Sequence, residues 1–141
     1  MVVTAQRFKE SVQEIGGEIV ASEIPGRTIK ELRESMGVTQ EEIGKLLGLR
    51  RETISRIENG NISPSFTSLK NFSRSIAALR AIRELFARED ASLIKKEEFN
   101  LLRPNFLRIY LNLPGQDVKL LYNLGEKGYL RSKKRILKVI K

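Results

Sequence analysis

The sequence predicts a mainly α-helical protein, and three observations support this fold class. Apolar residues recur at spacings of three and four over long stretches, which is the period of a helix with one buried face. Residues that begin and end helices stand at matching places: Glu42 follows Thr39 by three residues, and Gly48 follows the apolar positions. Breakers such as Pro25-Gly26 and Pro64 separate these helical patterns from one another.

These signals divide the chain into three regions. Residues 1–24 are predicted as an N-terminal helical arm, residues 25–90 as the main domain, and residues 91–141 as a C-terminal extension of α or α+β structure. In the arm, Gly16-Gly17 is expected to stop the helix, and the following run to Ile24 fits a strand or a loop equally well. The apolar stripe of the arm consists of Val3 or Thr4, Phe8, Val12 and Ile15.

Three short helices are predicted within residues 27–63, and a long helical pattern follows them. Ser65 is a suitable N-cap for this pattern because it comes directly after Pro64. The apolar stripe then runs through Leu69, Phe72, Ile76, Leu79, Ile82 and Phe86. We interpret the aromatic residues Phe66, Phe72 and Phe86 as core residues rather than as platforms on which bases stack.

The stretch from Thr39 to Gly60 has the pattern of two short helices joined by a tight turn. Thr39 caps the first helix and Gly48 ends it, because glycine readily adopts the left-handed conformation that closes a helix. Gly44 lies in the middle of this helix, where it costs about 1 kcal/mol relative to alanine but lets the next helix cross closely. The pattern therefore predicts a helix-turn-helix. Its inward residues are Ile43, Leu46, Leu47, Leu49, Ile54 and Ile57.

The composition narrows the function further. The net charge is +9, and residues 91–141 alone carry +8, which favours a polyanionic partner. The chain contains neither cysteine nor histidine, so the commonest general base and the preferred zinc ligands are missing. We therefore expect no enzyme activity, no cofactor and no metal. No apolar run approaches the roughly 20 residues of a membrane span, and nothing indicates secretion, so we expect a cytoplasmic protein without a membrane partner.

The chain resembles the phage repressor and Cro-like (XRE) helix-turn-helix family over residues 28–80. The motif has Gln40 at the start of its first helix, a small residue four positions later and Gly48 four beyond that. It continues as Arg-x-Thr-Ile-Ser-x-Ile-Glu-Asn-Gly from Arg51, and Pro64-Ser65 precedes the next helix. Gly44 departs from the alanine that is usual there. The resemblance implies a five-helix bundle with residues 50–58 as the recognition helix, and it implies nothing about residues after about 90.

The resemblance also implies roles for single residues. The positions that face base edges in the family are Arg51, Glu52, Ser55 and Arg56. Gln40 is expected to contact a backbone phosphate, aided by the helix dipole. Further phosphate contacts implied by analogy are Arg50, Thr53 and Asn59. Helical spacing independently places Glu52, Ser55 and Arg56 opposite the inward isoleucines. A plainer interpretation also stands, in which Glu52 forms a surface ion pair with Arg56 one turn later.

We therefore expect a sequence-specific double-stranded DNA-binding transcriptional regulator, a repressor that binds an inverted repeat as a homodimer. The alternative is an antitoxin-type module that uses the same DNA-binding domain and binds a protein partner through residues 91–141. Residues 131–141 include six basic side chains, which either contact DNA phosphates or form the solvated face of a packed element. A third interpretation makes residues 91–141 the dimerisation element, and the stripe from Leu69 to Phe86 is another candidate for it.

Overall fold

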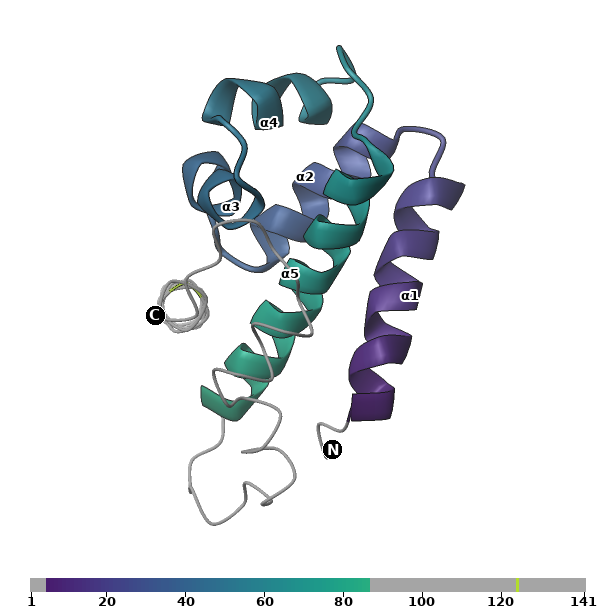
Figure 1. Ribbon diagram of the computed structural model, residues 1–141, viewed down its shortest axis with the longest axis vertical. Coiled ribbons are helices and arrows are strands. Elements are labelled where there is room, and N and C mark those ends of the chain that lie inside the picture. The colour runs from purple at the N-terminus through teal and green to yellow at the C-terminus, as the bar shows by residue number, and fades with distance from the viewer. Residues whose placement is uncertain (1–4, 87–123, 125–141) are drawn as a thin grey trace, which may run out of the picture.

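The computed structural model describes residues 5–86 and Leu124, and in this part of the chain it is built from helices alone (Figure 1). In chain order they are α1 (Ala5–Ala21), α2 (Pro25–Ser35), α3 (Gln40–Leu47), α4 (Arg51–Glu58) and α5 (Phe66–Phe86). The mainly α-helical class and the five-helix bundle predicted from the sequence are confirmed.

The long helix α5 is the centre of the bundle. Helix α1 lies along one side of it, and α2, α3 and α4 are grouped on the other side (Figure 1). The predicted stripe is buried: Ile76, Leu79 and Ile82 are each 1% exposed or less. Since neighbouring positions such as Ala77 and Ala78 are buried as well, α5 is covered around most of its circumference, as expected for a central helix.

One detail of the predicted helix pattern is confirmed and another is corrected. The long pattern that contains Leu69 and Phe86 forms the single helix α5, and α1 completes the bundle of five helices. Gly16-Gly17, expected to stop the first helix, does not stop it, and the run after it is neither strand nor loop until Ser22. Helix α1 continues through both glycines because Ile15 and Ile19, each 1% exposed, pack into the core. This burial outweighs the glycine cost of about 1 kcal/mol per residue.

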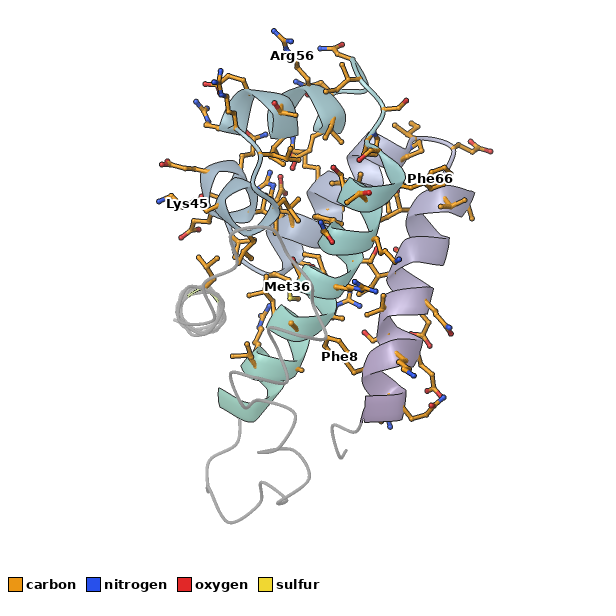
Figure 2. The ribbon with its side chains drawn as sticks, viewed as in Figure 1. Phe8, Met36, Lys45, Arg56 and Phe66 are labelled. Carbon is orange, nitrogen blue, oxygen red and sulfur yellow. The ribbon has the colours of Figure 1, made fainter. Side chains whose placement is uncertain are left out.

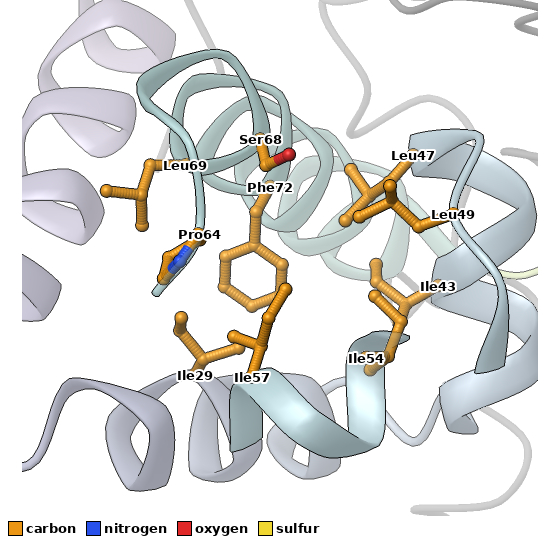
Figure 3. Close-up of a pocket in the computed structure, with 10 residues that line it drawn as sticks. All are labelled: Ile29, Ile43, Leu47, Leu49, Ile54, Ile57, Pro64, Ser68, Leu69 and Phe72. Atoms are coloured by element: carbon orange, nitrogen blue, oxygen red, sulfur yellow. The ribbon is translucent and has the colours of Figure 1, made fainter. Parts of the chain in front are cut away.

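The turn between α3 and α4 forms as predicted. Gly48 has a φ of 67° and ends α3, and Leu49 packs against the core. Gly44 is required because a Cβ there would lie 2.6 Å from the carbonyl oxygen of Leu49. Ile54 and Ile57 of α4 point inward onto Phe72 of α5 and other apolar residues of α2 and α3 (Figure 3). The cavity left among them is about 20 Å³, room for no more than a water molecule.

The capping box at the start of α3 is also confirmed. The backbone N–H of Glu42 donates to Thr39 Oγ1 at 3.1 Å, and the N–H of Thr39 donates to Glu42 Oε1 at 2.9 Å. Ser65 caps α5 in the same way, because the N–H of Ser68 donates to its Oγ at 3.1 Å. Each helix therefore begins after a residue whose side chain accepts from one N–H group of its first turn.

Replacing Thr39 with alanine should lower the free energy of unfolding by about 1 kcal/mol, because it removes the acceptor for the N–H of Glu42. Urea unfolding of the full chain measures this. Thr67→Ala is a matched control, since Thr67 is exposed in the first turn of α5 and is not its cap. Equal changes in both variants would contradict a stabilising role for the capping box.

Leu124 is the only described residue beyond Phe86, and it belongs to the core. It lies in a helical conformation, is 1% exposed, and joins the cluster formed by the bundle. The other predictions for residues 91–141, including the role of the basic stretch 131–141, lie outside the described residues. Among the described helices, none combines the length and the apolar character needed to cross a membrane.

Candidate nucleic-acid interface

Helix α4 presents a polar face to solvent at one end of the bundle. Arg51, Glu52 and Arg56 are exposed and Ser55 is half-buried, whereas Ile54 and Ile57 on the opposite face are buried. Figure 2 shows Arg56 pointing away from the molecule at this end. The four residues predicted to face base edges thus share the outer side of one helix. Between Glu52 and Arg56, both described, the structure has no ion pair.

The residues predicted to contact phosphates surround this face. Arg50 precedes α4 as its exposed N-cap residue, and Thr53 is half-buried within the helix. Asn59 follows the helix as its C-cap, and its Nδ2 donates a long hydrogen bond of 3.4 Å to Ser55 Oγ. Gln40 is the first residue of α3 and is also half-buried.

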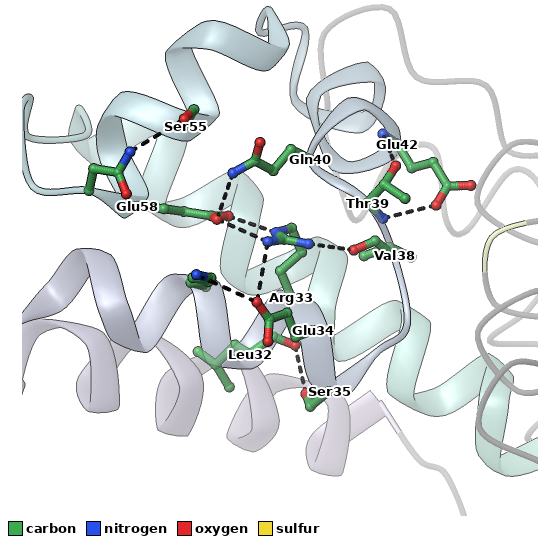
Figure 4. Close-up of polar contacts among 12 residues, drawn as sticks. Leu32, Arg33, Glu34, Ser35, Val38, Thr39, Gln40, Glu42, Ser55 and Glu58 are labelled. Carbon is green, nitrogen blue, oxygen red and sulfur yellow. Dashed lines mark hydrogen bonds and ion pairs between the residues drawn. The ribbon is translucent and has the colours of Figure 1, made fainter. Parts of the chain in front are cut away.

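A buried ion pair joins α2 to α4 beneath this surface (Figure 4). Arg33 Nε donates to Glu58 Oε2 at 2.7 Å, and Arg33 Nη2 donates to Glu58 Oε1 at 3.0 Å. The two side chains are only 9% and 1% exposed. Arg33 Nη1 also donates to the carbonyl oxygen of Val38 at 2.8 Å, which fixes the turn before α3. This bidentate geometry is the strongest form of an arginine–carboxylate contact.

The same carboxylate holds Gln40. Gln40 Nε2 donates to Glu58 Oε1 at 3.0 Å, so Glu58 connects α2, α3 and α4 (Figure 4). A side-chain amide carries two N–H groups, and the second one remains for another acceptor. Gln40 and Arg51 line the same open groove, which has a volume of about 700 Å³ and is bounded by the turn between α2 and α3.

Sequence reasoning did not assign a role to Arg33 or Glu58. Glu58 was part of the recognised motif, but its partner lies 25 residues earlier in the chain. One signal was present: Arg33 occupies a position between Leu32 and Met36 on the apolar side of α2. Charged residues are almost never fully buried unless they are paired, so an arginine in an apolar stripe indicates a buried partner.

Comparison with known proteins agrees with this geometry. A family model described as helix-turn-helix matches residues 29–76, which extend from α2 into α5. An uncharacterized HTH-type transcriptional regulator of Archaeoglobus fulgidus is 40% identical over 65 residues, which are 46% of this chain and 90% of that protein. The chain belongs to the helix-turn-helix family. The resemblance to repressor-like members inferred from the sequence is thereby confirmed.

Two further members of the helix-turn-helix family also match only part of the chain. A second uncharacterized HTH-type regulator of Archaeoglobus fulgidus is 37% identical over 68 residues, 48% of this chain and 93% of that protein. One from Methanothermobacter thermautotrophicus is 38% identical over 48 residues, 34% of this chain and 70% of that protein. No solved structure matches the chain significantly. Each of these relatives therefore aligns with less than half of this helix-turn-helix protein.

Proposed function

We propose that this protein is a sequence-specific DNA-binding transcriptional regulator that places α4 in the major groove. The observation that carries the proposal is the outer face of α4, where Arg51, Glu52 and Arg56 stand exposed on a helix whose inner face is fixed in the core. A helix is about 10–12 Å wide with its side chains, and the major groove of B-DNA is about 12 Å wide. The relatives named as transcriptional regulators support the same function.

Each polar residue of α4 has a chemical role in this proposal. Arginine donates two parallel hydrogen bonds to guanine O6 and N7, and we assign this role to Arg51 and Arg56. Glu52 accepts from the amino group of cytosine, and Ser55 contacts either base. The absence of an ion pair between the described residues Glu52 and Arg56 leaves both side chains available for bases.

The flanking residues would hold the DNA backbone. We assign phosphate contacts to Gln40, Arg50, Thr53 and Asn59. The groove between Gln40 and Arg51 runs along the start of α3, where the helix dipole favours an anion. Because Glu58 fixes the amide of Gln40, that amide is oriented before DNA arrives, and less conformational entropy is lost on binding.

The regulator would act as a repressor and as a homodimer on an inverted repeat. Helix-turn-helix proteins bind two half-sites about 34–36 Å apart, one helical turn, and a two-fold dimer matches a palindromic site. An occupied operator is then closed to the transcription machinery. The direct test is selection of bound sequences from a pool of random DNA duplexes, because the enriched sequences give the half-site, the spacing and the symmetry together.

Replacing Arg51 or Arg56 with alanine should weaken binding to the selected site by about 1–3 kcal/mol and relax the preference at one base pair. Competition binding against site variants with single base changes measures both effects. Lys9→Ala is a matched control, because it removes one exposed positive charge from α1. If each arginine variant weakened all duplexes equally, Arg51 and Arg56 would be phosphate contacts and the assignment would be wrong.

A further inference from the structure

Phe66, predicted as a core residue, is instead 90% exposed. Val20 at 71% and Ile24 at 56% are likewise large, apolar and exposed. Val20 lies on the last turn of α1, Ile24 directly precedes α2, and Phe66 is the first residue of α5. Single exposed apolar residues are normal on a protein surface, so the three residues carry meaning only if they lie together.

The three residues come from segments that meet at one corner of the bundle. Helices α1 and α5 pack against each other in opposite directions, so the end of α1 lies beside the start of α5 (Figure 1). Ser22 Oγ accepts from Thr28 Oγ1 at 2.7 Å and from the N–H of Ile24 at 3.1 Å, which holds the turn between α1 and α2. Figure 2 shows Phe66 pointing outward beside the end of α1. We call Val20, Ile24 and Phe66 the apolar corner.

The border of the apolar corner on α1 is acidic. Residues 10–24 contain four acidic side chains and no basic one. Glu14 and Glu18 lie one turn apart on α1 and are both exposed, and Glu23 is exposed in the turn that follows. Like charges one turn apart repel each other on a helix, so this arrangement costs stability unless a cationic group lies nearby.

The other sides of the apolar corner do not balance this charge. Arg27 of α2 is already paired, because its Nε lies 3.3 Å from the carboxylate of Glu31 one turn later. Residues 59–69 contain no charged side chain, and Lys70 is the first basic residue of α5. The apolar corner therefore stands in an excess of negative charge, although the net charge of the chain is +9.

A partner that matches this surface must be both apolar and basic, and one segment of this chain has that composition. Residues 131–141 contain six basic side chains, no acidic side chain and four aliphatic ones. The aliphatic residues of this segment are Ile136, Leu137, Val139 and Ile140. Aliphatic side chains suit an apolar surface, and lysine and arginine suit a border of exposed carboxylates.

The length of the chain allows this segment to reach the apolar corner. Leu124 is 1% exposed and belongs to the core of the bundle, and Leu137 comes 13 positions later. An extended chain spans about 3.3 Å per residue, so this distance is up to about 40 Å. Helix α5, with 21 residues, is about 30 Å long. A segment attached so closely has an effective concentration in the millimolar range, so a modest contact suffices to hold it.

We propose that the apolar corner binds residues 131–141 of the same chain and thereby keeps their six positive charges away from DNA. In this arrangement the aliphatic side chains cover Phe66 and its neighbours, and the basic side chains lie against the glutamates of α1. Helix α1 and residues 131–141 both lie outside residues 29–76, which the family model matches. The docking does not depend on the proposed function, whereas its effect on DNA binding rests on it.

Disulfide formation tests the docking without DNA. The chain has no cysteine, so a link between two introduced cysteines identifies a single contact. Val20→Cys combined with Leu137→Cys should form a link within one chain under mild oxidation, visible by non-reducing electrophoresis. Lys45→Cys combined with Leu137→Cys is the matched control, because Lys45 is exposed on α3, away from α1 (Figure 2). Adding Phe66→Ser to the first pair should slow its link several-fold.

The salt dependence of binding to a single selected half-site tests the effect on DNA. Each phosphate neutralised adds about 0.9 to the slope of log affinity against log salt. Val20→Ser with Phe66→Ser should release residues 131–141 and, with three of the six charges engaged, make the slope steeper by about 2–3. Removing residues 131–141 from this double variant should abolish the increase, and removing them from the natural chain should change the slope by less than about 1.

Three results would overturn the inference. If Leu137→Cys links to Lys45→Cys as fast as to Val20→Cys, residues 131–141 do not dock at the apolar corner. If the link joins two chains, the bound segment belongs to a second copy. If the link forms within one chain but the natural chain and the double variant have equal slopes, docking does not withhold the charges from DNA. Should the natural chain enrich no DNA sequence at all, the proposed function fails while the disulfide result stands.

Discussion

Replacing Glu58 with alanine should lower the free energy of unfolding by about 3–5 kcal/mol, among the largest effects expected for any single substitution in the described part of the chain. The reason is that the guanidinium of Arg33, 9% exposed, would lose both of its hydrogen bonds to Glu58 and would keep only the more exposed Glu34, whose Oε1 lies 3.7 Å from Nη2, as a counter-charge. Gln40 Nε2 would lose its acceptor at the same time. Urea unfolding followed by circular dichroism measures the change.

A double substitution separates the effect of the buried charges on stability from the effect of packing at this pair. Arg33→Met with Glu58→Leu replaces a buried ion pair by apolar side chains, which is often neutral or stabilising. We expect the double variant to recover most of the stability lost in Glu58→Ala. We expect both Glu58→Ala and the double variant to bind DNA more weakly than the natural chain, because Glu58 no longer orients Gln40 in either of them. A loss below about 1 kcal/mol for Glu58→Ala would show that the pair contributes no more than an exposed one.

The features that the sequence predicted correctly are those that depend on neighbouring residues. The capping box of Thr39 and Glu42 joins residues three apart, and Gly48 acts through its own backbone conformation. The buried stripe from Phe72 to Ile82 follows from helical spacing alone. The outward position of Glu52, Ser55 and Arg56 on α4 also follows from helical spacing, because Ile54 and Ile57 on the opposite face lie in the core.

The features that the sequence did not predict depend on parts of the chain that are distant in sequence. The continuation of α1 through Gly16 and Gly17 follows from packing along α5, where a Cβ on Gly16 would meet Ser73 Oγ at an ordinary 3.5 Å. The partner of Arg33 lies on another helix. Phe66 is exposed because it is the first residue of α5 and stands six positions before Phe72, about 120° around the helix from it.

The need for glycine at position 26, at the start of α2, also depends on residues that are distant in sequence. A Cβ on Gly26 would lie 2.3 Å from the carbonyl oxygen of Ile57 and 2.8 Å from that of Glu58. Both obstacles are backbone atoms of α4, which a rotamer change cannot move. The close contact fixes the first turn of α2 against the last turn of α4, directly behind the face that we assign to DNA.

Gly26→Ala should therefore lower the free energy of unfolding by about 3 kcal/mol or more, at the upper end of the usual cost of overpacking. Gly17→Ala is the matched control, since nothing lies within 4 Å of a Cβ built there and alanine favours the helix by up to about 1 kcal/mol. The two substitutions add the same methyl group and should change the free energy of unfolding in opposite directions.

Because α4 must shift to admit the new Cβ, Gly26→Ala should also weaken binding to a single half-site, and Gly17→Ala should leave it unchanged. Urea midpoints and half-site titrations measure both effects. Equal urea midpoints for the two variants would mean that α2 and α4 do not touch at Gly26. Another contact would then have to hold α4 in place.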